Sequence, residues 1–311
     1  MKKVLVFAVL AAISLSALCG LSGCSYSGSV TYANSDKYSV GNTEITDKIE
    51  SIEIDWLSGS ISLVSHSEDT VLLSEWDEES IPEDMRVRWW VDGSTLRVRF
   101  AASGAGVRTF GSFHKDLTLT LPETLAFENV TIRAASAEID ADRLTAGTLS
   151  VSTASGNINI SGEANTVELN SASGNIQLTQ KDKAGEVRID TASGKIDADL
   201  GSADRAYFES ASGRITVKAA SVDSLEVKAN SGAVLCELEA VPAECRLHAV
   251  SGGVTLVLPE ESDFTANIST ASGDFESDFA LKKDGNTYIC GSGGADIDIE
   301  TSSGDVGVYA R

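Results

Sequence analysis

Apolar and polar residues alternate along most of this chain, and a small hydroxyl residue followed by glycine interrupts the alternation at regular intervals. Two and four positions after these glycines the residue is mostly apolar, and four and six positions before each serine it is apolar again. A period of two predicts strands with one dry face. Each copy of the pattern therefore predicts a strand, a Ser-Gly corner, a second strand and a polar return.

The Ser-Gly corners recur at a nearly constant spacing. From Ser155 to Ser272 successive corner serines are 18, 20, 19, 19, 20 and 21 residues apart, and the last step, to Ser303, is 31 residues. A period near 20 is typical of repeat arrays, in which each unit buries its apolar face against its neighbours. The predicted structural corners are Ser155-Gly156, Ser173-Gly174, Ser193-Gly194, Ser212-Gly213, Ser231-Gly232, Ser251-Gly252, Ser272-Gly273 and Ser303-Gly304.

This periodicity predicts an all-β fold, in which residues 132–311 form a single-stranded β-solenoid (β-helix) of ~19–21-residue coils. Glycine allows the backbone to bend at each corner, and serine can bond to nearby backbone groups. A stack of separate hairpins in one long sheet is the alternative arrangement. No run of the sequence has a convincing helical periodicity.

The corner serines raise the question of catalysis, and the pattern favours a structural role. A nucleophilic serine needs a base within hydrogen-bond reach. The chain has three histidines, His66, His114 and His248, and none accompanies the repeated serines. An active site is normally built once, whereas this serine occurs eight times. We therefore predict that the protein is not an enzyme, with no catalytic residue and no cofactor.

The N-terminus has the features of a lipoprotein signal peptide, which we assign to residues 1–23. A short positive head, Met1-Lys2-Lys3, precedes an apolar run from Val4 to Leu18. The following Leu21-Ser22-Gly23-Cys24 resembles the bacterial lipobox. The resemblance implies cleavage before Cys24 and lipidation of its sulfur, palmitate included, which would anchor the mature protein outside the cytoplasm to the bacterial cell membrane. A plain secreted protein is the alternative.

Residues 24–48 are rich in Ser, Gly, Tyr, Asn and Thr and lack sustained periodicity. This composition predicts a flexible tether between the lipid and the fold. Residues 278–294 are a second irregular stretch, an insertion that lengthens the last corner spacing. We expect this insertion to fold over the terminal coil as a lid.

Residues 49–131 are β-rich but irregular, and they predict an N-terminal β cap that closes the open end of the array. Ser58-Gly59 is a diverged first copy of the corner, and Ala137 takes the glycine place after Ser136. Asp92-Gly93, between two alternating runs, predicts a hairpin. We expect the tryptophans to form the core of the cap, with a ligand platform as the alternative. All four lie in this region: Trp56, Trp76, Trp89 and Trp90.

Three features together resemble a known bacterial family. They are the segment LTLTLPE (117–123), the recurrent T/S-A-S-G-x-I corners and the closing TSSGDVGVY (301–309). The chain is similar to β-strand-repeat proteins described as adhesin-like domains of unknown function. The resemblance implies an extracytoplasmic, often membrane-attached β-solenoid, and the family has no agreed catalytic residues to carry over. Some relatives are linked to envelope stress responses, so the resemblance also implies an envelope sensor as an alternative role.

The chain is strongly acidic. It has 24 basic and 46 acidic residues and a net charge of −22. This balance excludes nucleic acid as a partner and disfavours a protein lying flat on anionic lipid. Solvation of the outward faces accounts for the charge, whereas attraction of cationic peptides or divalent ions is the sharper alternative. Asp296 and Asp298, near Glu300, Asp274 and Asp305, are only weak Ca²⁺ candidates without a defined loop, so no metal site is predicted.

Three cysteines follow Cys24. Cys236 and Cys245 fall in columns that hold Val, Leu or Ala in the other copies, and Cys290 lies in the insertion. Buried thiols are the expected state, because free cysteine packs as a small apolar residue. A Cys236–Cys245 disulfide across one coil is the alternative. The cysteine and histidine spacings match no metal motif.

The sequence leads to one preferred function and two alternatives. We expect a non-catalytic cell-surface lipoprotein, an adhesin-like scaffold that binds an unknown protein, peptide or glycan partner at the cell envelope or outside the cell. One alternative is an envelope-stress sensor or regulator that binds cationic peptides through its acidic surface. The other, a polysaccharide-active β-helix enzyme, is disfavoured because the outward columns lack a concentrated set of acids and bases.

Overall fold

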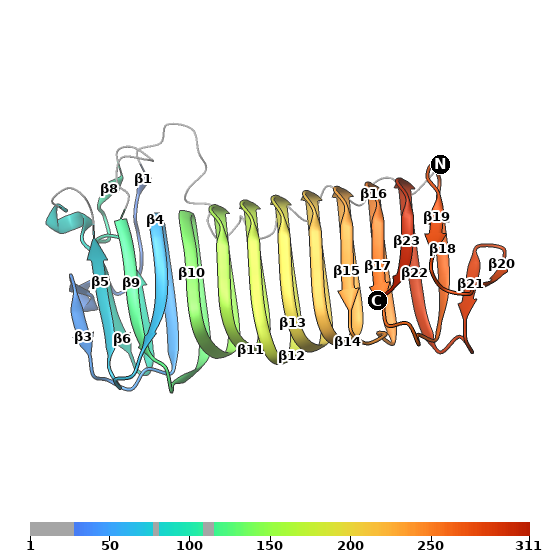
Figure 1. The fold of residues 1–311 in the computed structure, drawn as a ribbon. Helices are drawn as coiled ribbons and strands as arrows, with labels where there is room; N and C mark the ends of the chain where they lie inside the picture. The colour runs from blue at the N-terminus through green and yellow to red at the C-terminus, as the bar shows by residue number, and fades with distance from the viewer. Residues whose placement is uncertain (1–27, 77–80, 108–114) are drawn as a thin grey trace. The chain divides into compact units, whose positions relative to one another are not determined.

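The computed structural model describes residues 28–76, 81–107 and 115–311, and strands make up most of them (Figure 1). Within these ranges the helical segments are two 3-10 turns, η2 (Ser35–Lys37) and η3 (Glu83–Met85). The predicted all-β class is therefore confirmed. In the part of the chain that the structure describes, no helix is long and apolar enough to cross a membrane. The expected signal peptide and Cys24 lie outside the described residues.

The chain divides into two compact units, one up to Ile158 and one from Asn159 onward. The first unit is arranged around strand β4 (Ser51–His66), which pairs in parallel with β10 (Ala126–Ser155). In this register Ser58 lies beside Ser136 and Gly59 beside Ala137, so the two diverged corners identified in the sequence are neighbours. Since β10 pairs with β4 along both halves, the first copies of the array belong to this unit, and the division does not coincide with the boundary expected at residue 131.

The other edge of β4 is shared by two strands. Its first half pairs in parallel with β7 (Thr95–Arg99) and its second half with β9 (Lys115–Pro122). Strand β6 (Arg88–Asp92) forms the predicted hairpin with β7, and its turn contains Gly93 at a φ of 65°. Strand β5 (Val71–Trp76) is antiparallel to β9. Antiparallel strands thus continue the sheet beyond the parallel pair.

The segment expected to be a flexible tether is instead part of the first unit from Gly28 onward. It contributes β1 (Gly28–Ser29), β2 (Ser39–Val40) and β3 (Thr43–Ile45), which pair in antiparallel fashion with β8 (Gly106–Val107), β6 and β5. Its polar composition does not prevent this, because backbone groups of β6, β5 and β8 satisfy its own backbone donors and acceptors. The described part of the expected tether is therefore ordered by non-local pairing.

The tryptophans of the first unit do not share one role. Trp56 is 2 % exposed, donates its Nε1–H to the Lys115 carbonyl oxygen at 3.1 Å and packs against Phe100 with ring centroids 4.9 Å apart. Trp89 and Trp90 are half-buried, and Trp76 is 60 % exposed at the end of β5. The predicted cap core is thus correct for Trp56 and wrong for Trp76, whose position in β5 falls in the outward phase.

The second unit contains the regular copies. Its strands begin with β11 (Ile158–Ser173), β12 (Ile176–Ser193), β13 (Ile196–Ser212) and β14 (Ile215–Ser231). Successive strands from β12 to β14 pair in parallel, with one register shift between Gln180 and Lys183 of β12, and the corner serines lie side by side. The next coil is divided into β15 (Val234–Leu238) and β16 (Glu244–Ser251), which pair with the first and last parts of β14. Strand β17 (Val254–Leu258) follows the corner after β16. The inward residues form aliphatic ladders, as the alternation predicted.

The corner glycines of this unit allow adjacent backbones to approach closely. A Cβ added to Gly194 would overlap the carbonyl oxygen of Gly174, and one added to Gly213 would overlap that of Gly194. A side chain at these positions would therefore push the neighbouring copy away. The glycine in each corner is explained by this approach.

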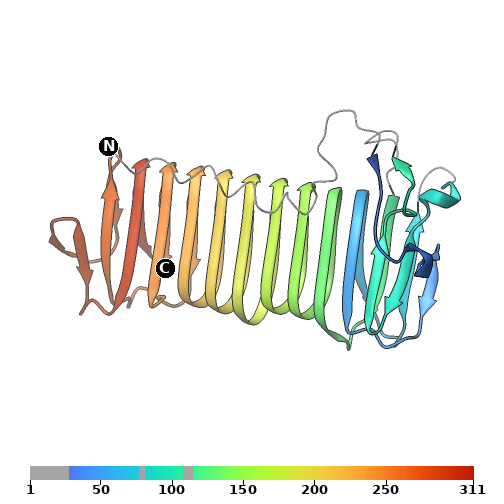
Figure 2. The same cartoon turned by 180° about the vertical axis from the view of Figure 1, so that it is seen from behind.

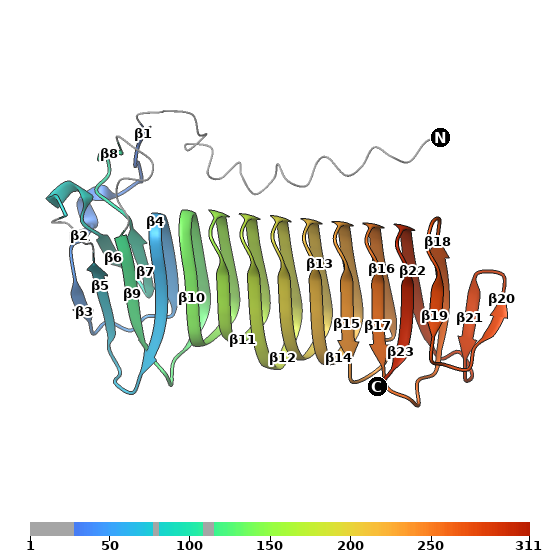
Figure 3. The ribbon, with the colours of Figure 1, turned by 45° about the horizontal axis from the view of Figure 1, so that its top comes forward.

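The last copies of the second unit are not stacked in sequence order. The final copy, β22 (Ala295–Ser303) and β23 (Val306–Ala310), lies between the copy that ends in β16 and β17 and the copy formed by β18 (Phe264–Thr270) and β19 (Phe275–Ser277) (Figure 3). The corner serines are consequently ordered Ser251, Ser303, Ser272. The corner spacing does not report the order in which the copies stack, so the position of the final copy is a finding of the structure.

The insertion at residues 278–294 makes this order possible. Its hairpin, β20 (Lys282–Asp284) and β21 (Thr287–Cys290), pairs in antiparallel fashion with the outer edge of β18 (Figures 1 and 2). The hairpin thus covers an edge that would otherwise expose backbone groups, which is the role expected of a lid. After the hairpin the chain returns to form the final copy on the inner side of β18.

Candidate functional site

The repeated hydroxyl groups of the second unit serve the corners. Two residues before the corner serines, hydroxyls donate to corner glycine carbonyl oxygens of the neighbouring copy. The bonds are Thr191 to Gly174 at 3.4 Å, Ser210 to Gly194 at 3.2 Å, Thr270 to Gly304 at 3.1 Å and Thr301 to Gly252 at 3.1 Å. The corner serines themselves are exposed along the edge of the sheet. This arrangement favours the structural interpretation of the corners.

The three cysteines among the described residues, Cys236, Cys245 and Cys290, are free thiols. Cys236 lies between Val217 and Leu256 in the ladders, and Cys245 occupies the same inward phase of β16. Burial raises the pKa of the Cys236 thiol well above its usual value and that of Cys245 to about 12. Both thiols are buried, as expected, and the two sulfurs are not bonded to each other in the structure. Cys290 donates to the Ser262 carbonyl oxygen at 3.2 Å and is also buried.

The weak Ca²⁺ candidates do not converge on one point. On β22, Asp298 lies between Arg246 and Asn267, and Asp296 lies in the next outward position along the strand. Glu300 faces His248, whose Nδ1 is 3.5 Å from a carboxylate oxygen. Among the described residues no group of three or more His, Cys, Asp and Glu side chains could hold a metal ion.

A charged network surrounds Tyr207 on the outward face of the second unit. The Arg188 guanidinium carbon lies 4.1 Å from the ring centroid, and the Tyr207 hydroxyl donates to Glu209. Arg188 Nε is 2.8 Å from an oxygen of Asp190. Burial raises the pKa of Asp190 to about 6 against the opposing charge of Arg188. The network joins neighbouring strands and makes this face sensitive to pH.

The first unit buries an ion pair that the sequence analysis missed. Lys115 is 0 % exposed, and its Nζ lies 3.0 Å from a carboxylate oxygen of Glu75. The same Nζ donates to the carbonyl oxygens of Met85 at 2.6 Å and Phe100 at 2.5 Å. Solvent does not reach this lysine, so it is a structural group. The signal was present, because Lys115 and Glu75 occupy the inward phase of β9 and β5.

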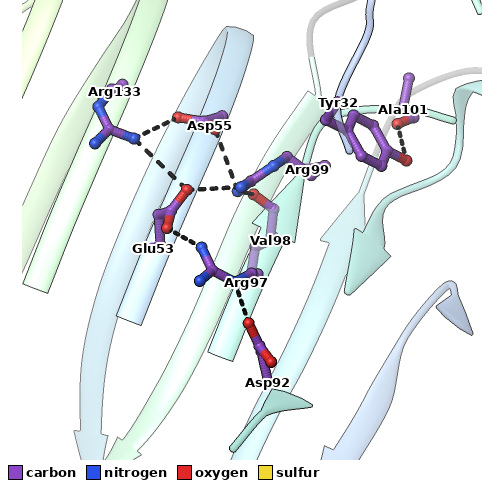
Figure 4. Close-up of polar contacts among 9 residues, drawn as sticks. All are labelled: Tyr32, Glu53, Asp55, Asp92, Arg97, Val98, Arg99, Ala101 and Arg133. Carbon is purple, nitrogen blue, oxygen red and sulfur yellow. Dashed lines mark hydrogen bonds and ion pairs between the residues drawn. The ribbon is translucent and has the colours of Figure 1, made fainter. Parts of the chain in front are cut away.

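Side chains with the chemistry to bind a partner gather on the outward face of β10, β4 and β7 (Figure 4). Glu53 lies opposite Arg97, and Asp55 lies opposite both Arg99 and Arg133. Arg97 forms an ion pair with Glu53, and Arg99 contacts Glu53 at 2.6 Å and Asp55 at 3.2 Å. Arg133 lies 3.3 Å from Asp55. Three guanidinium groups are therefore held side by side by two carboxylates.

Aromatic rings continue this face onto the N-terminal segment. Tyr38 lies between Tyr32 and Trp90, with ring centroids 4.8 and 5.7 Å apart. The Arg99 guanidinium carbon is 5.9 Å from the Tyr32 centroid and 5.8 Å from that of Tyr38, and Lys37 Nζ is 4.7 Å from the centroid of Trp90. Burial raises the pKa of both tyrosines, and the arginine charges oppose this rise. The Tyr32 hydroxyl donates to the Ala101 carbonyl oxygen at 3.0 Å.

We call this surface the arginine–aromatic face. It holds five cationic side chains against three carboxylates, whereas acidic residues outnumber basic ones in the whole chain. The sequence analysis missed it because its members come from separate segments that only the strand pairing brings together. Its members are Tyr32, Lys37, Tyr38, Glu53, Asp55, Arg88, Trp90, Asp92, Arg97, Arg99 and Arg133.

The chain was compared with known proteins. A search of curated proteins found no match. Solved structures that match the chain include a protein of Parabacteroides distasonis described as a "putative lipid binding protein", with 15 % identity, a TM-score of 0.49 and coverage of 87 % of this chain and 96 % of that chain. A "putative adhesin" of Parabacteroides merdae has 16 % identity, a TM-score of 0.45 and coverage of 91 % and 99 %.

The comparison with protein families agrees with the resemblance drawn from the corners and from the segments at 117–123 and 301–309. One family model matches residues 49–309, which include both of those segments and every corner copy. The chain belongs to the family described as Toastrack DUF4097.

Proposed function

We propose that this chain is a non-catalytic lipoprotein of the bacterial cell surface, a β-solenoid that presents its outward faces to a protein, peptide or glycan of the envelope or the extracellular space. The observation that carries the proposal is the use of the repeated hydroxyls. Thr191, Ser210, Thr270 and Thr301 donate to backbone carbonyls of neighbouring copies, so the most repeated polar groups of the chain support its architecture. The faces between the corners are left for binding.

The anchor in this proposal is a lipid on Cys24. The positive head, the apolar run and the lipobox-like Leu21-Ser22-Gly23-Cys24 support it. A lipid would hold the mature protein at the membrane without a spanning helix. Extracytoplasmic localisation follows from the same segment.

Two measurements test the proposal. The intact mass of the protein extracted from membranes is expected to show cleavage before Cys24 and added acyl chains, and Cys24→Ser is expected to release an unmodified protein. Unlipidated protein is then expected to bind a component of cell envelopes or of the extracellular matrix without converting it.

Turnover of a glycan panel that Ser212→Ala abolishes would contradict the non-catalytic role. Salt-sensitive binding of polycationic peptides, weakened by Asp296→Asn with Asp298→Asn, would instead support an envelope-stress sensor.

A further inference from the structure

We infer that the arginine–aromatic face of the first unit is a membrane-docking surface that binds anionic lipid headgroups beside the lipid anchor. The inference deepens the proposed function and rests on its anchoring at Cys24. The occupant is a lipid surface, because the length of chain between the anchor and the fold and the charge of the face both favour it.

The chain between the proposed anchor at Cys24 and the described fold is short. Gly28, the first residue of β1, is four residues after Cys24, and a chain extends at most about 3.6 Å per residue, so the two lie within ~14 Å of each other. Strand β1 is fixed to β8, and Val30 donates to the Ala105 carbonyl oxygen at 3.2 Å while Gly104 donates to the Val30 carbonyl oxygen at 2.7 Å. A long flexible tether would let the fold stand away from the bilayer, but this segment does not provide one.

The second argument is the chemistry of the face. Trp and Tyr side chains are enriched at the membrane–water interface, where an apolar ring and a polar edge are both accommodated. Tyr32 and Tyr38, on the segment nearest the anchor, and Trp90 are half-buried, so part of each remains accessible to solvent. Arginine binds phosphate through several N–H groups in a fixed fork. Aromatic and guanidinium groups together match a lipid headgroup region.

The third argument is charge. The cationic members of the face are Lys37, Arg88, Arg97, Arg99 and Arg133, whereas the whole chain carries a net charge of −22. Lys37 is exposed, and the side chains of Arg133 and Arg97 are 43 % and 29 % exposed. Anionic lipid attracts this face and repels the acidic remainder, so the contact is confined to it. The overall charge opposes flat binding of the chain but does not oppose docking through one face.

Within the face, Glu53 and Asp55 act as positioning residues. Glu53 contacts Arg97, Arg99 and Arg133, so one carboxylate holds three guanidinium groups on adjacent strands. Each guanidinium carries five N–H donors, more than its contacts with these carboxylates require. The carboxylates therefore orient the arginines. Arg99 is only 9 % exposed and holds the cluster together, whereas the exposed donors of Arg97 and Arg133 remain for phosphate.

The test uses the mature chain with Cys24→Ser, so that binding reports the face without the lipid. It is mixed with vesicles of phosphatidylcholine alone and with vesicles of equal parts phosphatidylcholine and phosphatidylglycerol, and bound protein is measured by co-sedimentation. We expect binding to the anionic vesicles only, falling as salt rises. Lys37→Gln with Arg133→Gln is expected to weaken it about 25-fold, since each cation near the surface contributes about five-fold.

The matched control is Lys181→Gln with Arg205→Gln in the second unit, which removes the same charge from side chains that are 61 % and 69 % exposed. This control is expected to bind the anionic vesicles about as strongly as the Cys24→Ser protein does, and more strongly than Lys37→Gln with Arg133→Gln. Thermal melts of all variants check folding. Equal losses in the two double variants, or no binding to anionic vesicles, would overturn the inference. Self-association that Lys37→Gln with Arg133→Gln abolishes would assign the face to a second copy instead.

The two proposals fail separately. Absence of acyl chains in the intact mass would remove the anchor at Cys24, and the vesicle measurement on the Cys24→Ser protein does not depend on that result. Conversely, a lipidated protein whose unlipidated form ignores anionic vesicles would keep the anchor and lose the docking surface.

Discussion

The second unit holds its strands together with in-register aliphatic ladders, whereas the first unit places a lysine and a glutamate in its interior. In the ladders, Ile196 contacts its equivalents in neighbouring copies, and no polar group has to be matched. In the first unit Lys115, Glu75 and two carbonyl oxygens must meet in one geometry. Repetition thus allows ladders of apolar side chains, and buried polar groups such as Gln180 and Thr191 bond only to the backbone of a neighbouring copy, while a cap that ends the repetition requires specific long-range side-chain contacts.

We expect the largest loss of stability when a charge is placed in an aliphatic ladder of the second unit. Ile196→Asp places an unpaired charge at a position that is 0 % exposed, and we expect a loss of more than ~4 kcal/mol in the free energy of unfolding. Ile176→Asp is expected to act in the same way. Thermal and denaturant unfolding measure the loss. The outward substitution Asp197→Asn is the control, and comparable stability of Ile196→Asp and this control would show that the inward assignment is wrong.

The buried pair of the first unit is the next largest effect. Lys115→Met leaves the buried Glu75 carboxylate with only its longer contact to Arg86, at 3.5 Å, in place of the cation at 3.0 Å, and we expect a loss of about 3–5 kcal/mol. Adding Glu75→Gln is expected to recover most of that loss, because the poorly compensated buried charge is gone. Denaturant unfolding of the single and double variants measures the coupling. If the double variant were no more stable than the single one, packing and not charge would dominate this site.

The corners provide a smaller effect. Gly213→Ala adds a Cβ that overlaps the Gly194 carbonyl oxygen, and the displacement of the neighbouring copy is expected to cost about 2–3 kcal/mol. Gly106→Ala is the control, since a Cβ there meets no atom within 4 Å. The shift in melting temperature distinguishes the two. A Gly213→Ala protein that melts like the control would remove close backbone approach as the reason for glycine.

The smallest effect is the pH dependence of the outward network. Burial raises the pKa of Asp190 to about 6 in the fold, above its ordinary value of 3.8, so the protonated carboxyl is the form that the fold favours. The stabilisation that protonated Asp190 adds to the free energy of unfolding is therefore complete below pH ~4 and is lost as pH rises through 6. Asp190→Asn is expected to match the parent at pH 4 and to exceed it by about 1 kcal/mol at pH 7.5, after allowance for solvent screening.

Unfolding of parent and Asp190→Asn at the two pH values measures this difference. The same measurement on Asp199→Asn, an exposed position paired with Lys181, is the control, and no gain in stability over the parent is expected at pH 7.5. A constant offset between Asp190→Asn and the parent at both pH values would mean that the substitution acts through the contact with Arg188 and not through protonation.

The part of the fold that the sequence could predict is the part that depends on local periodicity. The alternation around each corner identifies which side chains face inward, and Ile158, Ile196 and Val234 are buried accordingly. The same phase argument, applied to Lys115 and Glu75, would have located the buried pair. Periodicity does not report which strands become neighbours, so the arginine–aromatic face could not be assembled from the sequence. The order of the last copies was hidden for the same reason.

The sequence by itself determined the all-β class, the Ser-Gly corners with their apolar ladders, and the family, because each depends on residues close together in the chain. Only the tertiary structure decided that Gly28 to Ile45 pairs with the cap, that the final copy enters between its two predecessors, and that Glu53 gathers three arginines. These features depend on backbone hydrogen bonds and ion pairs between distant segments. A sequence pattern records the phase of a strand, and the partner of that strand is fixed only when the whole chain folds.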